Sequence, residues 1–267
     1  MGTICGCSAG HRHAQSDDRG HHDHVHDIDG TIDFGTGLAG VHIPGRRKER
    51  INRSERDILS KNAAFARANR AQLEESGSLA LNLVSSPGSG KTSLLLRAIA
   101  DLKHRFPIGV IEGDQRSSND PERIRETGVP VIQINTGWGG HLDAHMVSHA
   151  LDQLPMARSS LRFIENVGNL VFPAAIDLGE AHKVVVLSVT EGEDNMFAEA
   201  DLMLLNKVDL LPHLDLDISK CLELALHDNP QIQMLSVSAR TGEGLRAFDA
   251  RIEWRSSLAG RPAHALG

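Results

Sequence analysis

Residues 81–92 read Leu-Asn-Leu-Val-Ser-Ser-Pro-Gly-Ser-Gly-Lys-Thr, and residues 93–100 continue with a helix-forming composition. The order is an apolar strand, a glycine-containing loop and a helix. Gly88 and Gly90 let backbone N–H groups wrap around a phosphate, and the N-terminus of the helix adds the positive end of its dipole. This stretch therefore predicts a phosphate-binding loop between a strand and a helix.

The end of this loop fits the general pattern G-x-x-x-x-G-K-[ST], with Ser85 in place of the first glycine. In that pattern the lysine, here Lys91, reaches the β- and γ-phosphates, and the hydroxyl of Thr92 binds Mg²⁺. We therefore predict that a nucleoside triphosphate contacts these residues of the loop and the first helical turn: Gly88, Ser89, Gly90, Lys91, Thr92 and Ser93.

Apolar runs of strand length alternate with helical stretches along the rest of the chain. The runs lie at 79–84, 108–112, 129–134, 161–165, 183–189, 201–205 and 231–237. Residues 184–187 are apolar at every position, as expected of a strand that helices cover on both faces. The predicted fold class is α/β, a doubly wound, mostly parallel sheet of about seven strands in a P-loop NTPase.

The N-terminal part differs in character from this alternation. Residues 1–48 are crowded with Gly, His and Asp and hold no sustained period, which predicts a disordered His-rich tail. Ile51, Ile58 and Phe65, spaced by seven, then predict an amphipathic helix that Gly77 ends. The predicted organisation is a tail at 1–48, a helix at 49–78, a P-loop domain at 79–257 and a C-terminal tail at 258–267.

A second motif bears on the choice of base. Asn206-Lys207-Val208-Asp209 follows a strand, and the Asp209 carboxylate can accept from the N1–H and N2–H₂ of guanine, neither of which adenine offers. A site built around such an acceptor rejects the wrong base by ~10⁴. The stem of Lys207 can lie along the ring, and 238–240 can close the pocket. We therefore predict GTP, held by Asn206, Lys207, Asp209, Ser238, Ala239 and Arg240.

Two carboxylates at the ends of apolar strands are candidates to hold Mg²⁺ opposite Thr92. They are Asp114 and Glu165, at the edge where open α/β sheets bind ligands. Gly168 is predicted to donate its N–H to the γ-phosphate. No arginine stands out as one that stabilises the transition state, which predicts slow intrinsic hydrolysis. The predicted catalytic set is Lys91, Thr92, Asp114, Glu165 and Gly168.

The bulk properties exclude several classes of protein. The chain of 267 residues has a formal net charge of −7, which does not suggest a nucleic-acid binder. No apolar run approaches the roughly 18 residues needed to span a bilayer, and no hydrophobic signal core precedes the His-rich stretch. Three cysteines cannot form a disulfide framework. We therefore expect a cytoplasmic protein without nucleic-acid or membrane partners.

The N-terminal stretch is rich in side chains that bind transition metals. Imidazole suits Ni²⁺, Cu²⁺ and Zn²⁺, and thiolates are soft ligands. The predicted Ni²⁺ or Zn²⁺ ligands in this stretch are Cys5, Cys7, His11, His13, His21, His22, His24 and His26. Farther along, His141, His145 and His149 are four apart, so the last two share a face if a helix begins near Leu142.

Six segments together resemble the hydrogenase nickel-incorporation GTPases, the HypB family of the SIMIBI class. They are Asn-Leu-Val-Ser-Ser-Pro-Gly at 82–88, Ile-Glu-Gly-Asp-Gln at 111–115, Gln-Ile-Asn-Thr-Gly at 133–137, His-Leu-Asp-Ala-His at 141–145, Glu-Asn-Val-Gly-Asn-Leu at 165–170 and Asp-Leu-Gly-Glu-Ala-His-Lys at 177–183. The resemblance implies a GTP-dependent homodimer that delivers nickel to the large subunit of a [NiFe] hydrogenase, with a companion nickel and zinc accessory protein.

The sequence departs from the family's pattern at its metal ligands. The family's N-terminal Cys-x-x-Cys-Gly-Cys keeps only Cys5 and Cys7 here, and the Cys-His pair and later Cys of its second site read Gly140-His141 and Phe172. Only His141 remains as a predicted Ni²⁺ or Zn²⁺ ligand of that second site. Two alternatives stay open: a non-catalytic nickel or zinc store, and an accessory GTPase for another nickel enzyme such as urease.

Overall fold

The computed structural model describes residues 25–26, 31–33, 48–114, 120–136, 141–154, 157–168, 176–190, 200–215 and 217–259. The elements are, in chain order, β1 (Val25–His26), β2 (Thr31–Asp33), α1 (Lys48–Glu75), β3 (Leu79–Ser85), α2 (Lys91–Leu102), β4 (Ile108–Asp114), α3 (Asp120–Arg125), β5 (Val131–Asn135), α4 (Ala144–Gln153), β6 (Leu161–Glu165), β7 (His182–Ser188), β8 (Leu202–Asn206), the 3₁₀ helix η4 (Val208–His213), α5 (Ile218–Asp228), β9 (Gln233–Ser236) and α6 (Leu245–Ala259).

The seven predicted strands are β3 to β9, and every pair of neighbours among them is parallel. The sheet runs in the order β1-β2-β5-β4-β6-β3-β7-β8-β9. The prediction of an α/β fold with a mostly parallel sheet is therefore confirmed. No helix among the described parts of the chain is both long and apolar enough to cross a bilayer.

Two short strands that the sequence did not predict extend one edge of this sheet. β2 lies parallel to β5, with Thr31 opposite Gln133, and β1 pairs antiparallel with β2. An edge strand such as β5 presents unpaired N–H and C=O groups, which even a three-residue segment can satisfy. Three residues are too few to show a period, so the sequence predicted only a tail. The other residues of 1–48, apart from the first of α1, lie outside the described ranges.

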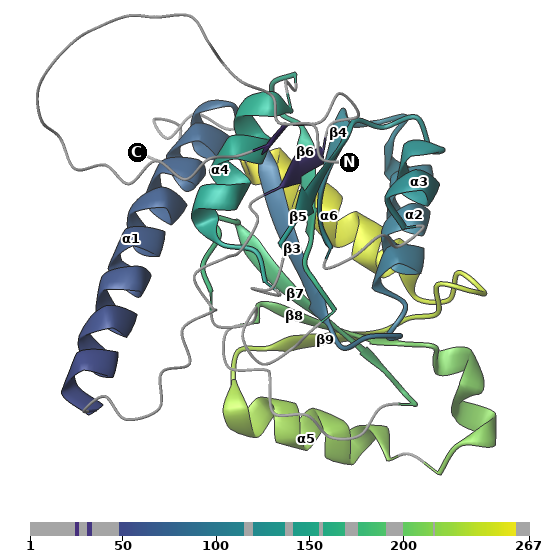
Figure 1. Ribbon diagram of the computed structural model, residues 1–267. Helices are drawn as coiled ribbons and strands as arrows, with labels where there is room; N and C mark the ends of the chain where they lie inside the picture. Colours follow the sequence, from purple (N-terminus) through teal and green to yellow (C-terminus); the bar gives the residue numbers. More distant parts are fainter. Residues whose placement is uncertain are drawn as a thin grey trace, which may run out of the picture.

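Helices cover both faces of the sheet (Figure 1). Alternate residues of β3 point to opposite faces. Leu81 and Leu83 pack in one core with residues of α2, α3 and α6. Ala80 packs in a second core with residues of α1 and α4, and Val84 in a third that includes Ala225 of α5. This is the doubly wound arrangement that uniformly apolar strands predict.

Helix α1 packs with a different stripe from the predicted one. The predicted stripe included Phe65, which is 38% exposed, whereas Ala66, Asn69 and Leu73 are buried at spacings of three and four. A small residue and an amide form most of this buried stripe, so hydrophobicity alone pointed to its neighbour. The helix ends at Glu75, two residues before Gly77, which is left-handed, with φ 64°, and whose N–H donates to the Glu74 carbonyl at 2.9 Å.

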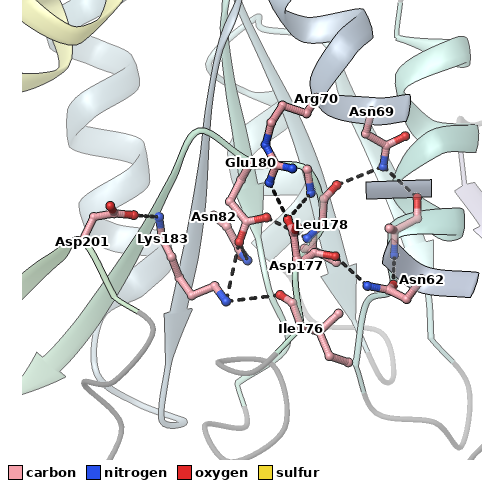
Figure 2. Close-up of polar contacts among 12 residues, drawn as sticks. Asn62, Asn69, Arg70, Asn82, Ile176, Asp177, Leu178, Glu180, Lys183 and Asp201 are labelled. Atoms are coloured by element: carbon pink, nitrogen blue, oxygen red, sulfur yellow. Dashed lines mark hydrogen bonds and ion pairs between the residues drawn. The ribbon is translucent and has the colours of Figure 1, made fainter. Parts of the chain in front are cut away.

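Side-chain amides fasten α1 to the rest of the protein (Figure 2). Asn69 donates to the Ala144 carbonyl at 2.8 Å and to the Leu178 carbonyl at 2.9 Å. Asn62 accepts from the Ala144 N–H at 2.8 Å and donates to the Asp177 carbonyl at 2.8 Å. Because buried carbonyls need donors, these contacts hold α1 against the start of α4 and the loop before β7.

That loop carries a buried glutamate with a complete set of partners. Glu180 Oε1 accepts from Asn82 at 3.0 Å, and Oε2 accepts from the Leu178 N–H at 2.7 Å. Lys183 Nζ lies 3.8 Å from Glu180 Oε1 and donates to the Ile176 carbonyl at 3.2 Å (Figure 2). The charge of this carboxylate is therefore both hydrogen-bonded and paired.

Candidate nucleotide site

The phosphate-binding loop lies where predicted, between the end of β3 and the start of α2. Gly88 and Gly90 adopt left-handed conformations, with φ of 81° and 91°, which other residues rarely adopt. A Cβ atom at Gly90 would lie 2.5 Å from the amide nitrogen of Asn206. Ser85, by contrast, is the last residue of β3 and pairs with Val186, so an extended serine fits where the general pattern has glycine.

Three of the predicted catalytic side chains meet at the first turn of α2. Thr92 Oγ1 donates to Glu165 Oε1 at 2.5 Å, and Lys91 Nζ lies 3.9 Å from the same oxygen. Lys91 also donates to Ser85 Oγ at 3.4 Å. Burial raises the pKa of the Glu165 carboxyl, and the charge of Lys91 and the Thr92 hydroxyl oppose that rise.

The surroundings of Glu165 fit a magnesium ion. Glu165 is only 4% exposed, and its Oε2 is buried with no hydrogen-bond partner among the described residues. Mg²⁺ prefers oxygen ligands, and the Thr92 hydroxyl beside Glu165 supplies a second one. The other predicted ligand, Asp114, ends β4 at the same edge of the sheet, but its side chain lies outside the described part.

The structure adds a second buried acid that the sequence analysis passed over. Glu112 of β4 stands in register with Glu165 of β6, so the two lie on neighbouring strands, and Glu112 is 4% exposed. Glu112 and Asp114 are two residues apart on one strand, which puts them on the same face. The sequence could have pointed to Glu112, because it is an acid within an apolar strand and lies two residues before Asp114.

Gly168 lies against the phosphate-binding loop. A Cβ atom at this position would be 3.5 Å from Pro87 Cα and 3.6 Å from Pro87 N. The structure therefore places Gly168 next to the phosphate-binding loop, and its role as an N–H donor to the γ-phosphate stays a prediction. Arg123, on α3 after β4, pairs with Asp120 of its own helix at 3.0 Å, and Arg116 lies outside the described residues.

The predicted base-reading residues contact the phosphate-binding loop directly. Asn206 donates to the Ser89 carbonyl at 2.8 Å, and Lys207 Nζ donates to the Gly88 carbonyl at 2.7 Å. Lys207 itself is left-handed, with φ 64°. Because both side chains hold carbonyls of the loop, the two motifs form one structural unit although they lie more than a hundred residues apart.

The 238–240 segment completes this unit. The Ala239 N–H donates to Asn206 Oδ1 at 3.1 Å, and Ser238 Oγ donates to Asp209 Oδ1 at 2.6 Å. Arg240 Nη1 lies 3.7 Å from the other oxygen of Asp209. All six predicted base-site residues therefore lie together at the carboxyl ends of β8 and β9, as expected for a ligand site of an open α/β sheet.

The predicted Ni²⁺ and Zn²⁺ ligands are mostly beyond the described ranges. Cys5, Cys7 and the tail histidines lie outside them, and His26 falls in β1 without a described side chain. His141 is partly exposed just before α4, whereas Gly140 and Phe172 lie outside. Over the described ranges, no group of three or more His, Cys, Asp or Glu side chains is arranged to hold a metal ion.

Comparison with known proteins agrees with the geometry of this site. Residues 79–236 match the family described as CobW/HypB/UreG, nucleotide-binding domain. The hydrogenase maturation factor HypB of Rhizobium leguminosarum bv. viciae is 63% identical, over 84% of this chain and 77% of that protein.

Two solved structures are also similar, each with a TM-score of 0.69 and each covered completely. HypB of Archaeoglobus fulgidus is 38% identical over 74% of this chain, and HypB of Helicobacter pylori, solved in complex with nickel, is 32% identical over 77%. The chain therefore belongs to the CobW/HypB/UreG family, within its HypB group.

Proposed function

We propose that the protein is a GTP-hydrolysing nickel metallochaperone that assists nickel insertion into [NiFe] hydrogenase. The GTPase part of the proposal rests on the direct contact between the phosphate-binding loop and the base-reading motif at 206–209. The side chains of Asn206 and Lys207 donate to carbonyls of the phosphate-binding loop, and the Asp209 carboxylate accepts a hydrogen bond from Ser238. A carboxylate held in that position suits the two N–H groups on the edge of guanine.

The chain's residues have distinct parts in the proposed hydrolysis. Lys91 and the backbone N–H groups around Gly88 and Gly90 bind and orient the β- and γ-phosphates. Thr92 and Glu165, with Asp114, would hold Mg²⁺, which neutralises charge on the phosphate oxygens when bound. Gly168 offers an N–H to the γ-phosphate, so its loop would respond to the presence of that phosphate. Slow turnover of this kind suits a switch.

The nickel part rests on the relatives and on the histidine-rich N-terminal stretch. A similar HypB protein was solved with nickel, and curated relatives bear the name hydrogenase maturation factor. We propose that Cys5, Cys7 and the histidines of residues 11–26 capture Ni²⁺ or Zn²⁺, with His141 as a further ligand. The proposed partners are a second copy of the chain in the GTP state, a companion nickel and zinc accessory protein and the hydrogenase large subunit, all in the cytoplasm.

A change of base preference tests the role of Asp209. Asp209→Asn replaces one acceptor by an N–H₂ donor, which matches the C2 carbonyl of xanthine and clashes with the N2–H₂ of guanine. We expect kcat/KM for Mg²⁺-dependent hydrolysis to fall ~10⁴-fold for GTP and to rise for XTP. Equal loss with both nucleotides, or equal use of GTP and ATP by the wild type, would contradict the proposed base site.

The alternative of a non-catalytic metal store makes the opposite prediction for Lys91. Lys91→Ala should lower GTP hydrolysis by about 10³-fold if the lysine neutralises the transferred phosphate. A store with an inert nucleotide domain would show no Mg²⁺-dependent turnover at all, in the wild type or in the variant. For the client, deletion of the gene should abolish hydrogenase maturation, and normal maturation would contradict nickel delivery to that enzyme.

A further inference from the structure

Two histidines on α4 face each other one helical turn apart. His145 and His149 lie four residues apart on one face, and their Nε2 atoms share a hydrogen bond of 3.1 Å. The ring centroids are 4.7 Å apart, with the planes nearly perpendicular at 77°. Both side chains are half-buried. The two Nε2 atoms therefore face each other beside the helix, and an ion bound by both would replace the hydrogen that they share.

This separation is the one that two nitrogen ligands of a single ion adopt. With metal–nitrogen bonds of about 2.0–2.1 Å, neighbouring ligands lie about 2.9 Å apart at a right angle and about 3.4 Å apart at the tetrahedral angle. We propose that His145 and His149 form a binding site for a divalent transition-metal ion, with both Nε2 atoms as ligands and water in the remaining positions. Both rings would then be neutral and carry their hydrogen on Nδ1.

The fold holds this pair in place before any ion arrives. Asp143 caps α4 by accepting from the Met146 N–H at 2.8 Å, and Asn62 of α1 accepts from the Ala144 N–H at 2.8 Å. The ring of Phe65, also on α1, lies 4.6 Å from that of His145. A pair whose helix is fixed at its start loses little conformational freedom on binding, which favours affinity.

The surroundings indicate binding rather than hydrolysis. Zinc peptidases use the same spacing, His-Glu-x-x-His, with the glutamate as general base. Here the position after His145 is Met146, which is buried and has no basic group. The pair also includes none of the residues at 140, 141 and 172, so the proposed ligands differ from those of the function proposed above.

Thermal unfolding of the full chain distinguishes this site from the histidine-rich N-terminal stretch. An ion raises the melting temperature only if it binds the folded chain more tightly than the unfolded one. A helical pair exists only in the folded chain, whereas the N-terminal stretch is predicted from its sequence to be disordered, and ligands of that kind bind in both states. We expect Zn²⁺, without nucleotide and at roughly 100 times its dissociation constant, to raise the melting temperature by about 5 °C.

Matched variants assign the effect. The double variant His145→Gln with His149→Gln should lose the Zn²⁺-dependent rise and bind about one ion fewer by equilibrium dialysis. His149→Cys, which keeps a zinc ligand, should retain the rise, and so should the control His227→Gln on the exposed side of α5. No rise in the wild type, an undiminished rise and ion count in the double variant, or loss of the rise in His227→Gln would each overturn the proposal.

Discussion

Two buried glutamates in this protein each lie near a lysine, but they differ in how many of their carboxylate oxygens are hydrogen-bonded. Glu165 is 4% exposed and lies 3.9 Å from Lys91, and Glu180 is 7% exposed and lies 3.8 Å from Lys183. Both oxygens of Glu180 accept hydrogen bonds, whereas Glu165 accepts one from Thr92 and leaves Oε2 without a partner among the described residues.

The difference separates a structural carboxylate from one that awaits a ligand. A buried charge is tolerated when each of its oxygens is hydrogen-bonded and a cation lies near, as at Glu180. An incompletely bonded buried carboxylate costs free energy, and burial accordingly raises the pKa of Glu165. Mg²⁺ with a nucleotide would remove that cost. Glu180 instead fixes the loop before β7 on the sheet.

The largest effect on stability is expected at Glu180. Glu180→Gln removes the negative charge 3.8 Å from Lys183 Nζ and puts an N–H₂ group against either Asn82 or the Leu178 N–H. We expect the free energy of unfolding to fall by about 3 kcal/mol, measured by urea unfolding. Glu74→Gln, on the exposed side of α1, is the matched control and should have little effect. A loss of the same small size in both variants would remove the distinction drawn here.

The opposite pattern is expected at Glu165. Glu165→Gln should lower Mg²⁺-dependent GTP hydrolysis by about 10²-fold, because a proposed Mg²⁺ ligand loses its charge. It should change the free energy of unfolding by less than about 1 kcal/mol, since the variant loses both the burial cost of a carboxylate and its attraction to Lys91. A destabilisation as large as that of Glu180→Gln would show that Glu165 is structural.

The pH dependence of the Glu165 pair has a definite sign. Because the pKa of Glu165 is raised in the folded state, the folded chain binds this proton more tightly than the unfolded chain. The wild type therefore gains stability as the pH falls through the raised pKa, and the glutamine variant does not. Urea unfolding at pH 7 and pH 5 should show that the midpoint of the variant, relative to that of the wild type, is lower at pH 5 than at pH 7.

A third carboxylate, Asp249, should give the smallest change in stability, and it tests whether an incompletely bonded carboxylate always marks a nucleotide site. Asp249 of α6 lines an open cavity of about 510 Å³ beside α2, and its Oδ1 has no partner among the described residues. Partial burial and the nearby Asp101 and Glu253 raise its pKa to about 6, against the attraction of Arg97. Like Glu165 it is incompletely bonded, but it is not one of the predicted nucleotide-site residues, and its cavity reaches the 238–240 segment only through Thr241 and Gly242.

Asp249→Asn should therefore stabilise the protein without changing GTP hydrolysis. The wild type loses stability as the pH rises from about 4 to about 6, because the folded chain holds the proton that the unfolded chain releases. Above that window we expect the variant to be more stable by up to about 1 kcal/mol, a value reduced for solvent screening, and equal below it. Reduced GTP hydrolysis in the variant would instead connect this cavity to the nucleotide site.

Much of the nucleotide site could be predicted from the sequence because its motifs are local. The strand, loop and helix around Gly88, Gly90 and Lys91 need only their own residues to adopt that shape. The meeting of 206–209 with 238–240 followed from a general rule, that parallel strands of an open sheet present their carboxyl ends at one edge. For the same reason Thr92 and Glu165, from different strand-to-helix units, were expected together.

The remaining features depended on contacts that no local pattern encodes. The register of β4 on β6 sets Glu112 beside Glu165, and the docking of α1 selects Ala66, Asn69 and Leu73 instead of the apolar stripe next to them. The sequence by itself determined the order of strands and helices and the chemistry of the phosphate and base motifs, because short-range periodicity and fixed spacing carry that information. Only the tertiary structure decided which buried carboxylate has all its partners, because those partners come from strands, loops and helices far apart in the chain.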